Sequence, residues 1–235
     1  VIDGKLDDEL WQRPGGWGLL ELETGREPIF RTSFKAAWQK DSLVMAITCL
    51  DQTAPVAEVV RLRGPEDRSL TASATNYLER LGPKLEHDDS AIWSGDVVEL
   101  LIETQAHSYY QIAINPHGTV VDLDRQGGKL NSLWKSGIQV ATQRAADHWI
   151  VELRLPIAGE EQAVLNPLDG VAGRAPSRTF PWHFNVCRQR IREDGSEYSA
   201  FSPTGADNFH NVMKFATLFD GNPTRMDHSC VASAV

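Results

Sequence analysis

Trp93 and Glu99 are the residues whose types and spacing first suggest ligand chemistry. Both lie in the stretch from Ala91 to Glu103, which reads AIWSGDVVELLIE. Alternate side chains of an extended chain point to opposite faces, so Glu99 lies on the face opposite to Val98 and Leu100. Trp93 precedes this predicted strand, where a loop would place its ring at the rim of the Glu99 face. An aromatic ring beside a carboxylate can form a small-ligand site, although a packing role for Trp93 and a solvated Glu99 also explain the pattern.

Two further predicted strands carry polar side chains for the same face. Ser108 to Asn115 is expected to pair with the Glu99 strand, which places Gln111 and Asn115 beside Glu99. The strand predicted from Trp182 to Arg190 offers a different polar lining together with Gln111. Its polar residues on the non-core face are His183, Asn185 and Gln189. Such groups supply the hydrogen-bonding partners that a polar ligand needs when it leaves water.

Four aspartates are candidates for a structural calcium site. Asp51, Asp88, Asp89 and Asp96 offer hard oxygen ligands near one predicted rim of the sheet. Their spacing does not match an EF-hand loop, and solvated acids are the alternative interpretation.

No catalytic signature accompanies these residues. The serines lack a G-x-S-x-G context, and the histidines are scattered without an H-E-x-x-H pattern. Asp96 and Glu99 could imitate the carboxylate pair of a glycosidase, but they point to opposite faces if the strand begins at Asp96. We therefore expect a protein that is not an enzyme.

The predicted elements that position these residues are almost entirely strands. About ten short strands with turn signals and one helix, Thr71 to Leu81, indicate an all-β antiparallel β-sandwich, jelly-roll-like, with one helical insertion at about 51–90. The strands include a hairpin from Phe30 to Leu50 and a short strand from Trp134 to Ala141. We expect one domain over residues 1–220, followed by a loose tail over residues 221–235.

The ends of this domain also carry patterns that can be tested. Residues Ile2 to Trp11 predict a turn at Asp3-Gly4 and a short helical turn that docks Trp11 into the core. In the strand from Trp149 to Leu155, alternation directs Glu152 outward.

Charge and composition exclude two classes of partner. The 235-residue chain has a formal net charge of −9, whereas nucleic-acid binding needs a concentrated basic surface. The same charge disfavours an anionic membrane, and no apolar run is long enough to span a bilayer. The three cysteines have no metal-like spacing and permit at most one disulfide.

Five segments, in this order, resemble the family 9 carbohydrate-binding modules. IDGKLDDELW at Ile2 to Trp11 resembles the opening motif of the family, and IWSGDVVELLIE at Ile92 to Glu103 resembles its central strand. QIAIN at Gln111 to Asn115, WIVELRLP at Trp149 to Pro156 and NFHNVMKFATL at Asn208 to Leu218 follow with the expected spacing. The resemblance spans nearly the whole chain apart from the insertion and the tail, and it implies a β-sandwich.

The resemblance also implies a binding site. In sugar-binding members, two aromatic residues clamp a terminal sugar over polar side chains of the sheet. Trp93 matches the first aromatic residue, and Phe209 falls where those members have a tryptophan. Glu99 matches an acceptor carboxylate, Asn115 a polar neighbour, and Asn208 lies close to an amide that contacts sugar.

Two positions depart from the sugar-binding pattern. The basic residue that the family places between Gln111 and Asn115 is replaced by Ala113, and its amide on a later strand falls on Cys187.

These patterns together predict a non-catalytic carbohydrate-binding module. We expect it to hold a saccharide end between Trp93 and Phe209 over Glu99, Asn115 and Gln111. We expect an extracellular or periplasmic location, within a larger secreted or surface protein of several domains. The expected partner is carbohydrate, and we expect binding to neither nucleic acid nor membrane.

Two alternatives remain open. One is a haem-binding sandwich domain of an electron-transfer protein, with axial ligands among Met45, Met213, His183 and Lys214. The other is a structural or interaction module without a sugar ligand.

Overall fold

A computed structural model of the chain describes residues 1–39, 42–51, 84–105, 108–125, 129–157, 165, 182–192 and 195–218. The helix predicted at Thr71 to Leu81 and the tail at 221–235 lie outside these residues, as does Cys230. The described cysteines, Cys49 and Cys187, are both buried and not joined in a disulfide.

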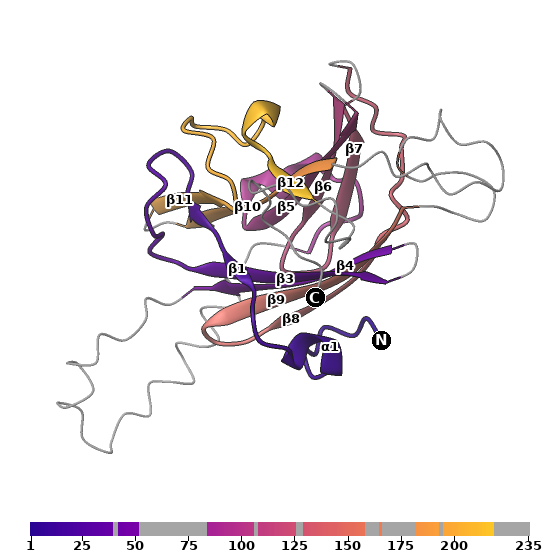
Figure 1. Cartoon of the computed structure of the whole chain (residues 1–235), viewed down its shortest axis with the longest axis vertical. Coiled ribbons are helices and arrows are strands. Elements are labelled where there is room, and N and C mark those ends of the chain that lie inside the picture. The colour runs from indigo at the N-terminus through magenta and orange to yellow at the C-terminus, as the bar shows by residue number, and fades with distance from the viewer. Residues whose placement is uncertain are drawn as a thin grey trace, which may run out of the picture.

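Two antiparallel sheets lie face to face and form a sandwich (Figure 1). The first, sheet A, has the strand order β1-β3-β4-β9-β8. Its strands are β1 (Trp17–Gly18), β3 (Thr32–Gln39), β4 (Ser42–Leu50), β8 (Gln139–Arg144) and β9 (His148–Pro156). The hairpin predicted from Phe30 to Leu50 is formed by β3 and β4, which pair from Thr32–Cys49 to Gln39–Ser42.

The second sheet, sheet B, contains the strand predicted to carry Glu99. Its order is β2-β11-β10-β5-β6-β7, and β12 also pairs with β10. Its strands are β2 (Leu20–Glu21), β5 (Val97–Gln105), β6 (Ser108–Ile114), β7 (Val120–Asp124), β10 (Trp182–Arg192), β11 (Gly195–Ala200) and β12 (Ala216–Leu218). The short helices are α1 (Glu9–Gln12) and the 3-10 helices η2 (Ser90–Ser94) and η4 (Val212–Lys214). The all-β sandwich predicted from the sequence is confirmed.

The core between the sheets follows the predicted alternation. Met45 of β4, Leu100 of β5 and Leu153 of β9 belong to one buried apolar cluster. The strand predicted from Trp134 to Ala141 begins later, at Gln139 in β8. Trp134 is nevertheless buried, because its ring packs against Tyr110 with centroids 4.6 Å apart. Its apolar character therefore marks a core contact of a loop and not the start of a strand.

Sheet B is packed on its core face and on parts of its outer face, because two further apolar clusters cover those parts. One contains Leu101, Phe209 and Phe215, and the other contains Ile92 and Val97 with Trp93 packed against it. Glu99 lies on this outer face, as predicted, but it is only 2% exposed. The outer face of sheet B is therefore in part a second packed surface.

The N-terminal segment is attached to the outer face of sheet A through Glu152. The backbone N–H groups of Asp3 and Gly4 each donate to Glu152 Oε2 at 2.9 Å, and Trp11 Nε1 donates to Oε1 at 2.8 Å. The predicted docking of Trp11 is confirmed. Glu152 does point away from the core, but the N-terminal segment covers it. Gly4 has φ +79 with backbone of Thr142 beside it, so a side chain there would be strained.

We expect Glu152→Ala to lower the free energy of unfolding by about 2 kcal/mol, because three buried or partly buried donors lose their acceptor. Urea denaturation measures the change. Glu9→Ala, which removes an exposed glutamate of α1, is the control and leaves the midpoint nearly unchanged. An equal midpoint for Glu152→Ala and wild type would show that the N-terminal segment adds no stability.

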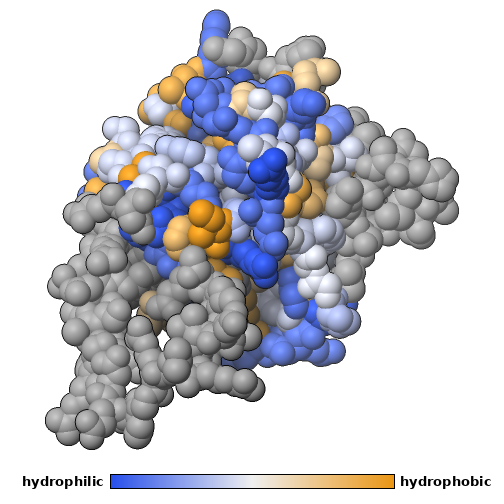
Figure 2. Space-filling view, turned by 90° about the vertical axis from the view of Figure 1, so that its left-hand side faces the viewer, coloured by the Kyte–Doolittle hydropathy of each residue, from blue (hydrophilic) through white to orange (hydrophobic). Residues whose placement is uncertain are grey.

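One face of the molecule shows how hydrophobic and hydrophilic residues are distributed over it. On the face drawn in Figure 2, hydrophobic side chains form small groups separated by hydrophilic ones. Within the described ranges, no helix has both the length and the hydropathy needed to cross a membrane.

Candidate functional site

A cavity of about 660 Å³ opens on the outer face of sheet B. Its walls come from segments that are far apart in the sequence but meet over the strands that carry Glu99 and Gln111. The lining residues used below are Asp88, Trp93, Glu99, Gln111, Asp122, Arg125, Gln189, Tyr198, Asp207, Asn208, Phe209 and His210.

Trp93 is held in place on one wall by hydrogen bonds at both ends. It belongs to η2, whose N-terminus is capped by the Asp89 side chain accepting from Ala91 N. Gln189 Nε2 donates to the carbonyl of Trp93 at 2.8 Å, and Trp93 Nε1 donates to Glu99 Oε1 at 2.9 Å. The half-buried indole ring is therefore fixed in orientation without any ligand.

Glu99 connects this wall to the floor of the cavity. Its second oxygen, Oε2, accepts from Gln111 Nε2 at 2.6 Å. Burial raises the pKa of Glu99, while the hydrogen bonds from Gln111 and Trp93 and the charge of Arg125 oppose that rise. Glu99 thus serves first to orient two neighbouring groups.

Gln111 extends the network to the opposite side. Arg125 Nε donates to Gln111 Oε1 at 2.6 Å, and the Arg125 guanidinium carbon lies 5.9 Å from the centre of the Tyr109 ring. The Tyr109 hydroxyl is 2.9 Å from His210 Nδ1. A continuous chain of contacts therefore joins Trp93 to His210.

The second wall carries Phe209, which is buried in the cluster around Leu101. Tyr198 of β11 contacts Phe209 edge to face, with ring centroids 6.2 Å apart, and Tyr198 remains partly exposed. Asn208 is exposed, and its side-chain oxygen accepts from His210 N at 3.0 Å. This wall offers aromatic surface below and polar groups at the rim.

The structure brings together five of the residues predicted for the site, namely Trp93, Glu99, Gln111, Asn208 and Phe209. It does not bring Asn115 among the lining residues. Asn115 shares the Glu99 face by alternation, but its side-chain oxygen accepts from His117 N and Thr119 N at 2.9 and 3.0 Å. Asn115 therefore stabilises the turn between β6 and β7.

The alternative polar lining is only partly present. Gln189 lines the cavity, whereas Asn185 Nδ2 donates to the Ser202 carbonyl and His183 Nδ1 lies 3.0 Å from Glu103. Cys187, where the family has an amide, pairs with Glu99 across β10 and β5 and is fully buried.

Sequence reasoning missed Arg125, Tyr198 and His210. A signal for Arg125 existed, because Val121 and Leu123 alternate onto the Glu99 face and Arg125 continues that alternation. Its backbone N–H donates to the Tyr109 carbonyl at 2.9 Å, so the pairing extends one residue beyond β7.

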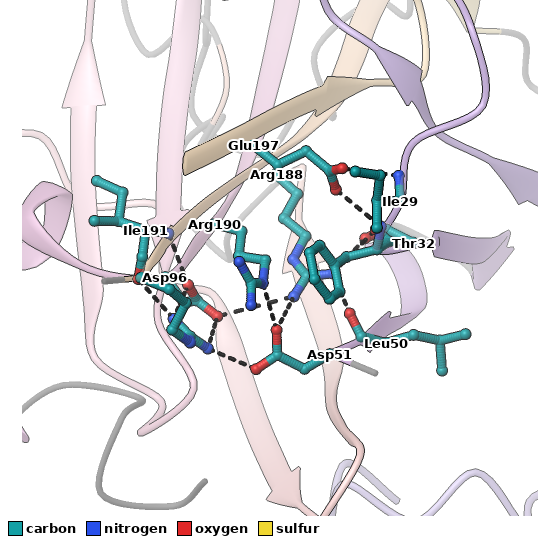
Figure 3. A network of polar contacts seen from close by, with 11 residues as sticks. Ile29, Thr32, Leu50, Asp51, Asp96, Arg188, Arg190, Ile191 and Glu197 are labelled. Atoms are coloured by element: carbon teal, nitrogen blue, oxygen red, sulfur yellow. Dashed lines mark hydrogen bonds and ion pairs between the residues drawn. The ribbon is translucent and has the colours of Figure 1, made fainter. Parts of the chain in front are cut away.

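The four aspartates predicted as calcium ligands do not form one site. Asp51 and Asp96 meet the guanidinium groups of arginines on β10 (Figure 3). Asp88 pairs with Lys135 at 2.6 Å, and Asp89 caps η2. Within the described ranges, no group of three or more His, Cys, Asp or Glu side chains is arranged to hold a metal ion.

The candidate haem ligands are similarly dispersed. Met45 is fully buried in the apolar core, Met213 is 79% exposed, and Lys214 is exposed. His183 pairs with Glu103. Met45 belongs to the apolar cluster that packs between the two sheets.

Comparisons with known proteins agree with this architecture. No model of a protein family matches the sequence, and no curated protein matches it significantly. A candidate carbohydrate-binding protein from Bacteroides uniformis has a similar fold, with a TM-score of 0.56 and 13% identity over 86% of this chain and 84% of that one.

Two structures of a family 9 carbohydrate-binding module from Caldicellulosiruptor kristjanssonii are also similar. The complex with cellotriose has a TM-score of 0.50 and 14% identity, covering 92% of this chain and 84% of that one. The complex with glucose has a TM-score of 0.50 and 14% identity, covering 89% and 94%. At this identity the likeness concerns the fold, which is the one that the five sequence motifs predicted.

Proposed function

We propose that this protein is a non-catalytic module that binds the end of a saccharide in the cavity over Glu99. The observation that carries the proposal is the half-buried Trp93 ring, fixed by Glu99 at the wall of a cavity that Phe209 and Tyr198 also line. A sugar ring has carbon–hydrogen faces that stack on aromatic surfaces and hydroxyls that need hydrogen-bond partners. The cavity offers both kinds of surface.

The departures from the family pattern are compatible with this role. Ala113 removes the family's basic side chain from β6, but Arg125 supplies a guanidinium to the same floor from the end of β7. The sugar-binding tryptophan is replaced by Phe209, and Tyr198 lies against it. The floor thus retains a carboxylate, an amide and a cation in a new arrangement.

We place the protein outside the cytoplasm, in an extracellular or periplasmic location and within a larger multidomain protein, because saccharide-binding modules act on glycans there. The location of the full-length product in fractionated cells checks this placement. Recovery in the cytoplasmic fraction alone would contradict this part of the proposal.

Calorimetric titration with a panel of mono- and oligosaccharides, with calcium and then with a chelator, tests the binding proposal. We expect saturable binding in wild type and a loss of affinity of about 30-fold in Trp93→Ala, because an aromatic ring that stacks on the ligand contributes about 2 kcal/mol. Trp93→Phe retains a ring but loses the bond to Glu99, so its loss is smaller.

Ile29→Ala, which truncates an exposed apolar side chain, is the control and binds like wild type. A folded Trp93→Ala variant with unchanged affinity would remove the site assignment. A flat response of folded wild type across the whole panel would remove the carbohydrate function and leave the interaction module as the better interpretation.

A further inference from the structure

The charge of Arg125 has no matching carboxylate beside it in the described part of the cavity. Arg125 is half-buried, and among the N–H groups of its guanidinium only Nε–H has a hydrogen-bond acceptor in the described part of the chain, Gln111 Oε1. No ion pair within the described ranges includes its guanidinium group. Glu99 interacts electrostatically with Arg125, but its carboxylate oxygens accept hydrogen bonds from Trp93 and Gln111.

The acidic groups around the cavity are already engaged or solvated. Asp88 forms an ion pair with Lys135 at 2.6 Å. Asp122 Oδ1 accepts from Ser136 Oγ at 2.7 Å, and Asp207 is exposed at the rim. None of these three carboxylates is within ion-pair distance of Arg125 in the described part of the chain. The half-buried guanidinium of Arg125 therefore has further N–H donors with which it can bind a ligand.

Arg125 is also fixed in orientation before any ligand arrives. The Gln111 bond holds its Nε edge, and the guanidinium carbon lies over the Tyr109 ring, 5.9 Å from the ring centre. The planar guanidinium can then present its remaining N–H groups as a fork, which matches the two oxygens of a carboxylate. Desolvating a charge is favourable only if an opposite charge accompanies it.

We propose that the saccharide end bound in this cavity is acidic, a terminal uronic acid whose carboxylate pairs with Arg125. This inference rests on the proposed carbohydrate function. Trp93 and Phe209 contact the sugar ring, and Arg125 selects the carboxylate. Asp88 and Asp207 at the rim repel a densely charged polyanion, so the fit is to one carboxylate at the end of a chain.

The test uses two matched pairs of disaccharides. One pair ends in glucose or glucuronic acid, the other in galactose or galacturonic acid, and the members of each pair differ only in that terminal carboxylate. We expect one uronate to bind about tenfold more tightly than its neutral counterpart, since a charge-assisted bidentate contact contributes about 1.5 kcal/mol. The preference declines with added salt. A sugar carrying a 6-sulfate that binds equally well would overturn the assignment of a carboxylate.

Arg125→Gln removes the preference, and Arg125→Lys retains part of it because a point charge replaces the fork. Arg144→Gln changes the net charge equally at an exposed position outside the cavity and keeps the preference. Equal affinity for neutral and acidic sugars, or a preference that survives Arg125→Gln, overturns the proposal while the carbohydrate function stands. Failure of every sugar, neutral or acidic, removes both.

Discussion

Asp96→Ala is expected to lower the free energy of unfolding by about 3–5 kcal/mol, because it leaves three buried arginines with Asp51 as their one remaining counter-charge among the described residues. The Asp96 carboxylate is fully buried and accepts from Ile191 N at 3.1 Å and from both terminal nitrogens of Arg192. Arg188 Nη2 lies 3.8 Å away, and the Arg188 side chain is 1% exposed. Denaturation in urea followed by tryptophan fluorescence measures the loss.

The size of this effect follows from what the network joins. Arg188 extends from β10 in sheet B, and its Nη1 donates to the Leu50 carbonyl at 2.7 Å and to Thr32 Oγ1 at 3.2 Å in sheet A. Asp51, at the end of β4, accepts from Arg190 Nε at 2.6 Å and from Arg192 Nη2 at 2.8 Å. Loss of Asp96 thus weakens a connection between the two layers of the sandwich.

The ionised form of the network is the one that we take as native. Burial raises the pKa of Asp96. Burial also opposes the charge of Arg192, but the hydrogen bonds and charges of Asp96 and Asp51 outweigh this effect and raise the pKa of Arg192. Three guanidinium groups surround two aspartates here, and the hydrogen bonds and charge of Arg192 and the charge of Arg188 oppose the rise in the pKa of Asp96 and favour its ionised form.

Two variants separate the causes of the Asp96 effect. Asp96→Asn keeps the shape of the side chain and one acceptor oxygen but removes the charge. We expect it to show about half of the loss in unfolding free energy of Asp96→Ala, and this half is the contribution of the charge. Glu27→Ala breaks an exposed ion pair with Arg31, and such pairs contribute less than about 1 kcal/mol. A loss below about 1 kcal/mol for Asp96→Ala would show that the network does not stabilise the sandwich.

The sequence predicted the parts of the fold that depend on alternation along one strand. Glu99 and Gln111 share a face of neighbouring strands because side chains alternate with period two, and the position of Trp93 before β5 predicted its place at the rim. These local rules do not depend on the remote parts of the chain.

Burial from remote segments was not predictable in the same way. Glu152 points away from the core as predicted, but its burial comes from Asp3 and Gly4, about 150 positions earlier in the chain. Local pattern contains no information on that contact.

The acidic residues show a second limit of prediction from the sequence. Asp51 and Asp96 have the chemistry of calcium ligands and also that of arginine partners, and composition does not decide between them. The segment RQRIR from Arg188 to Arg192 places three guanidinium groups on one face. That alternation was the signal that favoured ion pairs over calcium.

Glu99→Ala is expected to weaken saccharide binding about 100-fold at neutral pH. The change leaves Trp93 Nε1 and Gln111 Nε2 without their acceptor, and Arg125 loses the charge that lies behind Gln111. The Trp93 ring and the Gln111 amide then lose their fixed orientation at the same time. The loss of two charge-assisted hydrogen bonds lowers the binding free energy by about 3 kcal/mol. Calorimetric titration with the tightest ligand of the panel measures the change.

The pH dependence of binding provides an independent test of the same role. Burial raises the pKa of Glu99 above its ordinary value of 4.5. As the pH falls through that raised pKa, one oxygen becomes a donor and can no longer accept from Trp93 or Gln111, so the affinity falls while exposed carboxylates remain ionised. The contribution of Glu99 to the free energy of unfolding has the opposite sign, because a folded state with the higher pKa takes up the proton more readily and gains stability as the pH falls.

Loss of binding in mild acid is therefore not a consequence of Glu99-linked unfolding. Glu99→Gln keeps the shape, binds more weakly than wild type and loses this part of the pH profile. Glu103→Gln, on the same strand and face but outside the cavity lining, keeps both the affinity and the profile. A wild-type affinity that is constant through the acid range, or a Glu99→Ala variant that is folded and binds normally, would show that Glu99 does not organise the site.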